Sequence, residues 1–284
     1  MTVTHALLAC DIDGTLIRSD RTISERTRTA LQRVAATGAQ VALVTGRPDY
    51  NTRRVQEALG FPVHVIGYNG AVAHDHSGSG GPVFSQSMSQ TQIQDIHATS
   101  VQLGLTCALY EFGKEYIQTT TRGYSAEHQA LLDRFEAESQ DTFKSLDSPI
   151  DVIASAKKTP KMFILTQDPA EHLHAVRQAA PGVNVYEERY FLDCVPKAVD
   201  KSVGLASLCK SLGIPMTAVV AFGDGTNDVE FLKSVGLGIA MKNGVDDVKQ
   251  VGVAHHVTHF SNDEDGVAIE VEEILRRGQF GSLV

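Results

Sequence analysis

The feature that most constrains this chain is a short apolar run, Leu7–Cys10, which leads directly into two acids, Asp11 and Asp13. The run predicts a buried β-strand with both acids at its carboxyl end. In parallel α/β sheets that end of the strands forms the ligand crevice, so both carboxylates are expected at the mouth of a site. Neighbouring buried carboxylates repel unless a cation or a proton neutralises them. The pattern therefore favours a divalent metal ion and phosphoryl transfer.

Phosphate-binding groups are predicted at two further places. The apolar residues 41–44 end in Thr45, Gly46 and Arg47, where a hydroxyl and backbone N–H groups could hold phosphate oxygens. Lys201 begins an amphipathic helical pattern further along the chain. Its ammonium could neutralise both a nucleophilic aspartate and a transferring phosphoryl group.

A second acidic cluster follows another apolar run, residues 218–222, and contributes Asp224, Asn227 and Asp228. Mg²⁺ takes oxygen ligands and usually binds through one or two protein carboxylates together with substrate phosphate. We therefore expect Mg²⁺ as the cofactor, with Asp11 and Asp224 as its direct carboxylate ligands. A dinucleotide-binding Gly-x-Gly-x-x-Gly motif is excluded here, because Asp228 stands where its third glycine would be.

Composition limits the class of protein. The chain has 284 residues, 42% of them hydrophobic, which is enough for one large or two modest domains. A net charge of −9 without a basic stripe argues against nucleic acid as a partner. The four cysteines show no Cys-x-x-Cys spacing, and no apolar stretch approaches a membrane span or a signal peptide. We expect a cytoplasmic protein, monomeric or homodimeric, with no membrane partner.

The order of the patterns predicts a discontinuous core. Strands alternate with helices at first; Ser24 and Gly38 limit one helical pattern, and Pro48 and Gly60 limit another. A Gly/Ser-rich tract at residues 77–82 interrupts this alternation. Mixed α+β patterns then run to residue 195, after which strands and helices alternate again. The acidic triplet 263–265 is expected to place favourable charge at the N-terminus of the last helix.

The fold class predicted is therefore α/β, a doubly wound parallel Rossmann-like sheet with an inserted α+β cap domain. Residues 1–82 and 196–284 would form the catalytic core, and residues 83–195 the cap. Four basic residues of the insertion are candidate readers of an anionic substrate: Arg122, Lys157, Lys158 and Lys161.

The chain strongly resembles the haloacid dehalogenase superfamily, in particular Cof-like phosphatases with a type II cap. The matching motifs are Asp11-Ile12-Asp13-Gly14-Thr15-Leu16, Thr45-Gly46-Arg47, Lys201, Gly223-Asp224-Gly225-Thr226-Asn227-Asp228, Asn69-Gly70-Ala71, Gly238-Ile239-Ala240-Met241-Lys242-Asn243 and Ser261-Asn262-Asp263-Glu264-Asp265-Gly266-Val267-Ala268. The resemblance implies a Mg²⁺-dependent hydrolase of a small phosphorylated metabolite, and suggests sugar phosphates or pyridoxal phosphate as substrates.

In this interpretation Asp11 attacks phosphorus and becomes a phosphoaspartate, while Asp13 protonates the leaving alkoxide and then activates water. The catalytic set is Asp11, Asp13, Thr45 and Lys201. Phosphate would be held by Thr45, Gly46, Arg47, Lys201 and Asn227. The metal set is Asp11, Asp13, Asp224 and Asp228. Asp228 would orient metal-bound water or Lys201, and the resemblance implies that Asp13 binds the metal through its backbone carbonyl.

Two alternatives use the same groups. A sugar phosphomutase would retain the phosphoaspartate long enough to pass the phosphoryl group to a second sugar hydroxyl, and sequence does not separate it from a phosphatase. A phosphosignalling receiver also combines acids, a hydroxyl residue and a lysine on a parallel sheet. A receiver, however, needs neither an insertion as long as residues 83–195 nor a second acid pair near the C-terminus.

Overall fold

The structure is a computed structural model, and it describes residues 4–76, 81–111, 114–118, 130, 133, 143–146, 158–188 and 191–282. The chain divides into two compact units. One unit combines Met1–Phe84 with Asp200–Val284, and the other is Ser85–Val199. None of the helices in the described ranges is long and apolar enough to cross a membrane.

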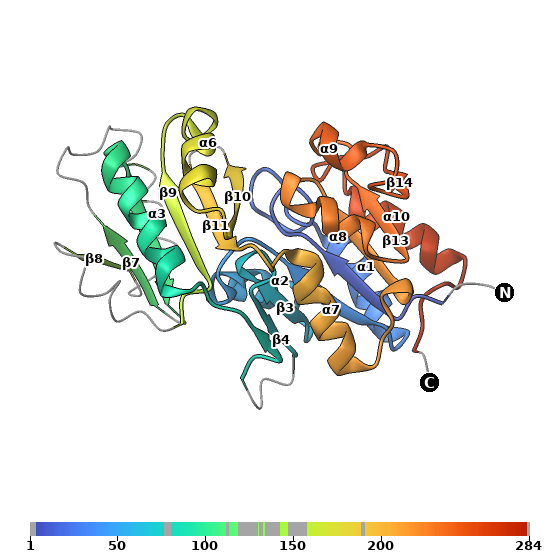
Figure 1. Cartoon of the computed structure of the whole chain (residues 1–284). Helices are drawn as coiled ribbons and strands as arrows, with labels where there is room; N and C mark the ends of the chain where they lie inside the picture. The colour runs from blue at the N-terminus through green and yellow to red at the C-terminus, as the bar shows by residue number, and fades with distance from the viewer. Residues whose placement is uncertain are drawn as a thin grey trace. The chain divides into compact units, whose positions relative to one another are not determined.

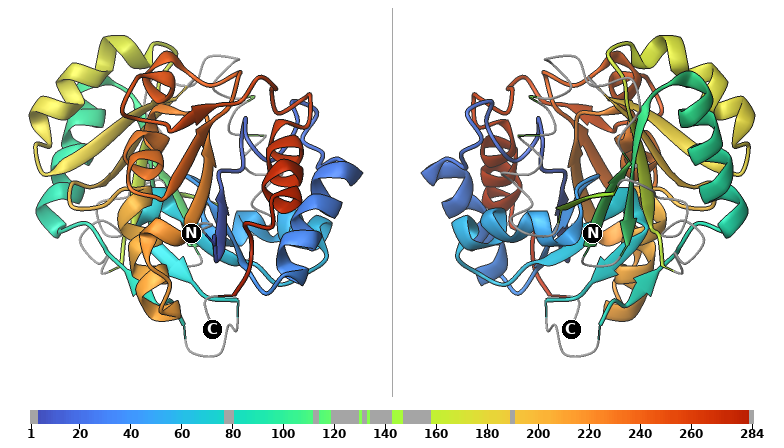
Figure 2. Two further views of the ribbon diagram at one scale, coloured as in Figure 1. Left: turned by 90° about the vertical axis from the view of Figure 1, so that its right-hand side faces the viewer. Right: turned by 90° about the vertical axis from the view of Figure 1, so that its left-hand side faces the viewer.

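The first unit is built on an eight-stranded sheet with the order β14-β13-β12-β1-β2-β3-β4-β5 (Figures 1 and 2). The strands are β1 (Leu7–Cys10), β2 (Gln40–Val44), β3 (His64–Gly67), β4 (Val72–His74), β5 (Phe84–Ser85), β12 (Val219–Gly223), β13 (Leu237–Ala240) and β14 (His256–Val257). From β14 to β3 every neighbouring pair is parallel. This confirms the predicted α/β class with its parallel core sheet.

Helices cover both faces of this sheet. They are α1 (Glu25–Ala36), α2 (Arg53–Leu59), α7 (Lys201–Leu212), α8 (Val229–Lys233), α9 (Asp246–Lys249) and α10 (Gly266–Arg276), with short 3-10 turns η1 (Asp49–Thr52), η2 (Tyr68–Gly70), η3 (Met216–Ala218) and η4 (Thr226–Asp228). Leu8 and Cys10 pack with α1, α2 and α10, whereas Leu7 and Ala9 pack with α7 and α8. Because strand side chains alternate between faces, β1 is buried on both, as a doubly wound sheet requires.

Local sequence signals set the ends of these helices. The Ser24 hydroxyl accepts a hydrogen bond from the Thr27 backbone N–H and caps α1, as its position before the helical pattern predicts. The Asp200 carboxylate caps α7 in the same way, accepting from the backbone N–H groups of Ser202 and Val203. This cap fixes the first turn of α7, and with it the backbone of Lys201.

The sheet departs from an all-parallel arrangement at one edge, because β4 pairs antiparallel to β3. The reversal occurs in η2, where Tyr68, Asn69 and Gly70 all have positive φ, at 53°, 53° and 95°. Three successive left-handed residues turn the chain back on itself without room for a crossover helix, so the next strand runs in the opposite direction.

The second unit has a six-stranded sheet with the order β10-β11-β9-β6-β7-β8. Its strands are β6 (Thr106–Glu111), β7 (Lys114–Gln118), β8 (Phe143–Leu146), β9 (Lys161–Leu165), β10 (Val183–Glu188) and β11 (Phe191–Pro196). Two helices, α3 (Gln90–Leu103) and α6 (Pro169–Ala179), pack with one face of the sheet through Ile93, Ile96 and Val176. Residues 130 and 133 of this unit are helical.

Candidate active site

The strand order brings the chemically important segments to one edge of the first unit's sheet. Strand β1 lies between β2 and β12, and Cys10 is in register with both Leu43 and Phe222. The residues that follow these strands therefore meet at the same carboxyl edge. They include Asp11 after β1, Thr45 after β2 and Asp224 after β12.

Lys201 is almost completely buried, with 1% of its side chain exposed. Its Nζ donates hydrogen bonds of 2.6 Å to Oδ1 of Asp11 and of 2.6 Å to Oδ1 of Asp228. Burial alone would lower the pKa of Lys201, but the charges of Asp11 and Asp228 outweigh it and raise the pKa. The lysine is therefore held as a cation against the two carboxylates.

Asp228 also shapes the turn that carries Asp224. Its Oδ2 accepts hydrogen bonds of 2.9 Å from the backbone N–H groups of Asp224 and Gly225. A Cβ atom on Gly223 would lie only 2.6 Å from the Asp228 carboxyl carbon, so a side chain there would displace it. Both oxygens of Asp228 are therefore engaged, one by Lys201 and one by this turn.

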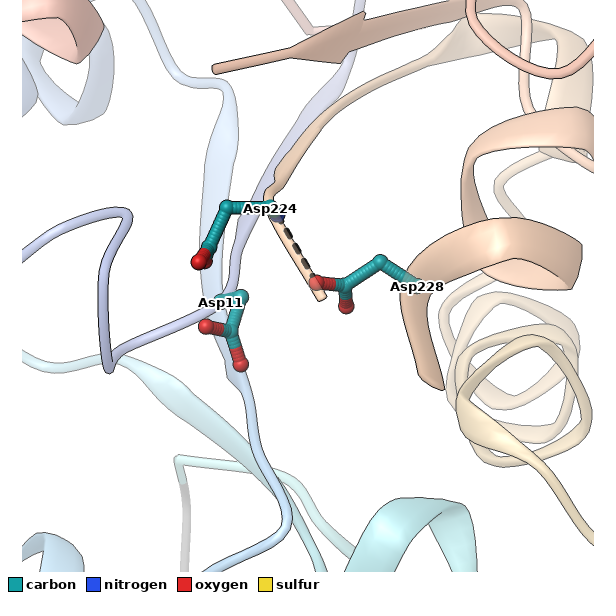
Figure 3. A group of neighbouring side chains, drawn as sticks. All are labelled: Asp11, Asp224 and Asp228. Carbon is teal, nitrogen blue, oxygen red and sulfur yellow. Dashed lines mark hydrogen bonds between the residues drawn. The ribbon is translucent and has the colours of Figure 1, made fainter. Parts of the chain in front are cut away.

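Three carboxylates form the group that could hold a metal ion (Figure 3). Asp11, Asp224 and Asp228 each offer an oxygen, and these atoms all lie within 4.8 Å of one another. Burial raises the pKa of Asp11 well above its usual range; Lys201 opposes this shift and the charges of Asp228 and Asp224 add to it. Burial and the Asp228 charge raise the pKa of Asp224 to about 6. Such an all-oxygen, mutually repelling set suits a hard divalent cation.

Thr15 and Gly14 position Asp224, a role that the sequence did not predict for either residue. The Thr15 hydroxyl donates a 2.6 Å hydrogen bond to Asp224 Oδ1. Gly14 has φ +76°, and a Cβ there would lie 2.3 Å from Asp224 Oδ2. Glycine is therefore required at this position both for its backbone conformation and for the close approach of the carboxylate.

Asp13 stands apart from this carboxylate group. Its side chain is 58% exposed and is bound by Arg47, whose Nε and Nη2 donate hydrogen bonds of 2.6 and 2.5 Å to its two oxygens. The Asp13 carboxylate is therefore not a member of the described group, Asp11, Asp224 and Asp228, that could hold a metal ion. The structure pairs Arg47 with an acid, whereas the sequence alone had suggested only a phosphate for it.

The remaining predicted phosphate-binding residues lie around the η2 turn. The Thr45 hydroxyl accepts a 3.1 Å hydrogen bond from the Arg47 backbone N–H. The Asn227 amide donates a 2.9 Å bond to Oδ1 of Asn69, and a Cβ on Gly46 would lie 3.0 Å from that same oxygen. The sequence predicted no role for Asn69 beyond its membership of a family motif. Its left-handed backbone is the structural feature that distinguishes it.

The loop that follows Asp13 is fastened by residues near the C-terminus. The Asn243 amide donates a 2.7 Å bond to the Gly14 carbonyl, and the Asn262 amide donates a 2.9 Å bond to the Ile17 carbonyl. The backbone N–H of Asn262 in turn donates to Oδ1 of Asn243 at 3.0 Å. We call these two residues the asparagine clamp.

The acidic triplet directly precedes α10, where it was predicted to place charge, and it also has a second use. Its three side chains bind partners beyond the first turn of α10: Arg18 with Asp265 at 2.7 Å, Ser19 with Asp263 at 2.7 Å, and Lys242 with Glu264 at 2.9 Å. Asp265 stands at the N-cap in a left-handed conformation and makes no side-chain cap. Its charge also holds the loop after Asp13 through the ion pair with Arg18.

The candidate anion readers of the second unit are placed in different ways. Lys161 is 4% exposed, and its Nζ donates a 2.5 Å hydrogen bond to Asp193, which is 2% exposed. A lysine committed to a buried ion pair is a poor candidate for a substrate anion. Lys158 is exposed. Arg122 and Lys157 lie outside the described residues.

Comparison with known proteins identifies the family. The model of the haloacid dehalogenase-like hydrolases matches residues 8–271. A 5-amino-6-(5-phospho-D-ribitylamino)uracil phosphatase of Bacillus subtilis, YitU, is 29% identical over 276 residues, covering 94% of this chain and 96% of the relative.

Solved structures agree with this result. A haloacid dehalogenase-like hydrolase from Bacteroides thetaiotaomicron has a TM-score of 0.79 at 26% identity, over 95% of this chain and all of that one. The fold is also that of a sugar phosphatase of HAD subclass IIB, with a TM-score of 0.80 at 22% identity over 96% of this chain and 98% of the other. The resemblance noted in the motifs is confirmed: the chain is an enzyme that belongs to the haloacid dehalogenase-like hydrolase family.

Proposed function

We propose that this protein is a Mg²⁺-dependent phosphatase that hydrolyses the phosphomonoester of a small metabolite through a phosphoaspartate on Asp11. The observation that carries the proposal is the buried Asp11 carboxylate, held by Lys201 beside Asp224 in a chain of this hydrolase family. This arrangement combines a fixed nucleophile, a fixed cation and an oxygen-rich cluster in one place.

Asp11 and Asp224 are the residues that would hold Mg²⁺. The hydrogen bonds that Asp11 and Asp224 accept with their side chains end on Oδ1 of each, so among the described residues no donor binds Oδ2 of either. Asp228 supports the site by holding Lys201 and the Asp224 turn, since both its oxygens already accept hydrogen bonds. When bound, the ion supplies positive charge that offsets the carboxylates and the transferring phosphoryl group. The backbone carbonyl of Asp13 is a further ligand that the family resemblance implies.

The nucleophilic step forms a bond from an Asp11 oxygen to phosphorus and breaks the bond from phosphorus to the substrate's alkoxide. Lys201 keeps Asp11 oriented and supplies fixed positive charge beside the phosphoryl oxygens. The Thr45 hydroxyl, the backbone of Gly46, and the side chains of Arg47 and Asn227 would hold the same oxygens. Division into two displacements lowers the barrier of each.

Asp13 is proposed to act at both steps. It first gives its proton to the departing alkoxide, and it then takes a proton from the water that attacks the phosphoaspartate, which restores Asp11 and releases phosphate. Asp13 is two residues after the nucleophile, and its exposed carboxyl is bound by Arg47. Because Arg47 binds both carboxylate oxygens and favours the ionised form, this pair must open before Asp13 can carry a proton to the leaving group.

The substrate is proposed to be a phosphorylated sugar, a sugar alcohol derivative or a pyridoxal phosphate-like compound. The relative YitU is named for a phosphoribitylamino compound, and one solved neighbour is named a sugar phosphatase. The insertion, residues 83–195, is proposed to be a cap that selects the leaving group and excludes water. The enzyme would act in the cytoplasm.

The test is a screen of phosphorylated metabolites with the full chain and Mg²⁺, measuring released phosphate. Labelled phosphoryl donor should leave acid-quenched label on wild-type protein but none on Asp11→Asn. Glu57→Gln, which removes an exposed acid of α2, is the matched control and should retain both activity and label. Label on another residue would overturn the nucleophile assignment, and transfer of label to a sugar hydroxyl in place of water would identify a phosphomutase.

A further inference from the structure

The η2 turn has an unusual backbone. Tyr68 and Asn69 are not glycines, yet both have φ of 53°, and both are fully buried. Left-handed backbone is rare for Tyr, and although Asn adopts it more readily than most non-glycine residues, two such residues in succession are uncommon and cluster at functional sites. The turn is therefore held in a costly conformation by what it contacts.

One set of contacts joins the turn to the segment after β2. The Asn69 backbone N–H donates a 3.0 Å hydrogen bond to the Thr45 carbonyl, and the Tyr68 N–H donates a 2.9 Å bond to the Arg47 carbonyl. The side chain of Asn69 also lies so close to Gly46 that a Cβ there would be 3.0 Å from Oδ1. The backbone of this proposed phosphate-binding segment thus rests on the turn.

Other contacts join the same turn to two more segments of the proposed site. Oδ1 of Asn69 accepts the 2.9 Å hydrogen bond from Asn227, which follows β12. Gly70 approaches the start of α7 so closely that a Cβ would lie 1.9 Å from the Asp200 carbonyl oxygen and 2.9 Å from the Lys201 nitrogen. Strand β1 lies between β2 and β12 in the sheet. The turn therefore connects segments that follow strands on either side of β1.

We propose that Asn69 is a positioning residue that sets the distance between Thr45 and Asn227 across the site, and so fixes the pocket for the phosphoryl oxygens. The inference rests on the proposed function and deepens it. A single buried residue is tied by its backbone to one loop and by its amide oxygen to the other. Without that amide the hydrogen bond that connects the two loops is lost, and the phosphate ligands no longer converge.

The left-handed backbone gives a clean way to separate this role from a role in folding. Asn69→Gly removes the amide but suits positive φ, so the backbone strain is relieved while the link to Asn227 is lost. Misplacement of binding groups by about 1 Å can cost about 10²-fold in rate. We therefore expect kcat/KM to fall by about 10²-fold while the Tm stays close to that of wild type, because the relieved backbone offsets the lost hydrogen bond.

Arg21→Gly is the matched control, because Arg21 is another non-glycine residue at positive φ, 68°, but lies in an exposed turn. It should leave kcat/KM within about twofold of wild type. A double-mutant cycle with Asn227→Ala adds a second readout, the coupling between the two substitutions in kcat/KM, which a merely structural role would not change. The two substitutions should be strongly non-additive, since each removes the same link.

Binding of inorganic phosphate in the presence of MgCl₂, measured by calorimetry, makes the test independent of turnover. Its Kd should rise about tenfold or more in Asn69→Gly and stay unchanged in Arg21→Gly. Equal Kd and kcat/KM in Asn69→Gly and wild type would overturn the inference and leave the proposed function standing. A wild-type protein that hydrolyses no phosphomonoester would overturn the proposed function, while the phosphate Kd would still decide the inference. If Asn69→Gly unfolds under the assay conditions, the same Kd is measured for it and for wild type in a stabilising osmolyte such as sucrose.

Discussion

Replacing Asp224 by Asn should stabilise the metal-free protein while it destroys the proposed metal site. Burial and the Asp228 charge raise the pKa of Asp224 from 3.8 to about 6. One pKa unit corresponds to about 1.4 kcal/mol, so the ionised carboxylate costs about 3 kcal/mol of folding free energy near neutral pH. Asn has nearly the same shape, and its amide oxygen can still accept the bond from Thr15. We expect a gain of about 1–3 kcal/mol at pH 7.5.

The sign of the pH dependence follows from the raised pKa of Asp224. A group whose folded pKa lies above its unfolded value contributes stability below the unfolded pKa, and this contribution is lost as the pH rises through the folded pKa. For Asp224 the window runs from about 4 to about 6. Relative to Asp224→Asn, the wild-type free energy of unfolding should therefore fall across that window, by at most about 1.4 kcal/mol per pH unit.

Urea unfolding with a chelator present, at pH 4.5, 6.0 and 7.5, measures this difference. Asp263→Asn is the control, because backbone and side-chain hydrogen bonds from Ser19 lower the pKa of that exposed carboxyl and its loss should bring no gain. Added Mg²⁺ should then stabilise the wild type but not Asp224→Asn, as expected for a ligand that binds only the folded state. A variant less stable than wild type at pH 7.5, or a pH-independent difference, would refute the argument from repulsion.

Three further predictions concern Lys201, Lys161 and the asparagine clamp. Lys201→Met leaves the Asp11 and Asp228 carboxylates buried without their cation, so activity should vanish and urea unfolding should show a loss of about 3–5 kcal/mol. Lys161→Met breaks a buried ion pair of the second unit and should destabilise by a similar amount, while hydrolysis of a small activated ester by the folded protein, assayed at low temperature, is retained. Asn262→Ala loosens the clamp on the loop after Asp13. It should therefore slow alkyl phosphates, whose leaving groups need a proton, more than p-nitrophenyl phosphate, and equal losses on both would count against a role for the clamp in positioning Asp13.

Much of the fold could be predicted because the signals are local. Four-to-five-residue apolar runs such as Leu7–Cys10 give the buried strands, and Ser24 marks the start of α1 through a hydrogen bond within its own first turn. The antiparallel strand β4 was not predicted. It depends on Tyr68 and Asn69 adopting positive φ in succession, which is rare for Tyr and is not signalled by Asn69 alone.

The same distinction applies to the candidate site. The expectation that groups after parallel strands share one edge depends only on strand ends, and the structure does bring Asp11, Lys201 and Asp228 into contact. The partner of Asp13 could not be predicted, because an acid and an arginine 34 positions apart carry no signal of pairing. Asn69 was equally hidden, since its role depends on a hydrogen bond to Asn227.

The asparagine clamp shows why such partners become predictable only once the strand order is known. Asn243 is 229 positions from Gly14, yet the two are in contact because β13 lies beside β12 and β12 beside β1. Loops that follow neighbouring parallel strands are neighbours themselves, so segments remote in sequence can hold the loop that carries Asp13. Residues near both ends of the chain therefore build one site, and the loop after Asp13 owes its position to contacts formed only when the C-terminal strands have joined the sheet.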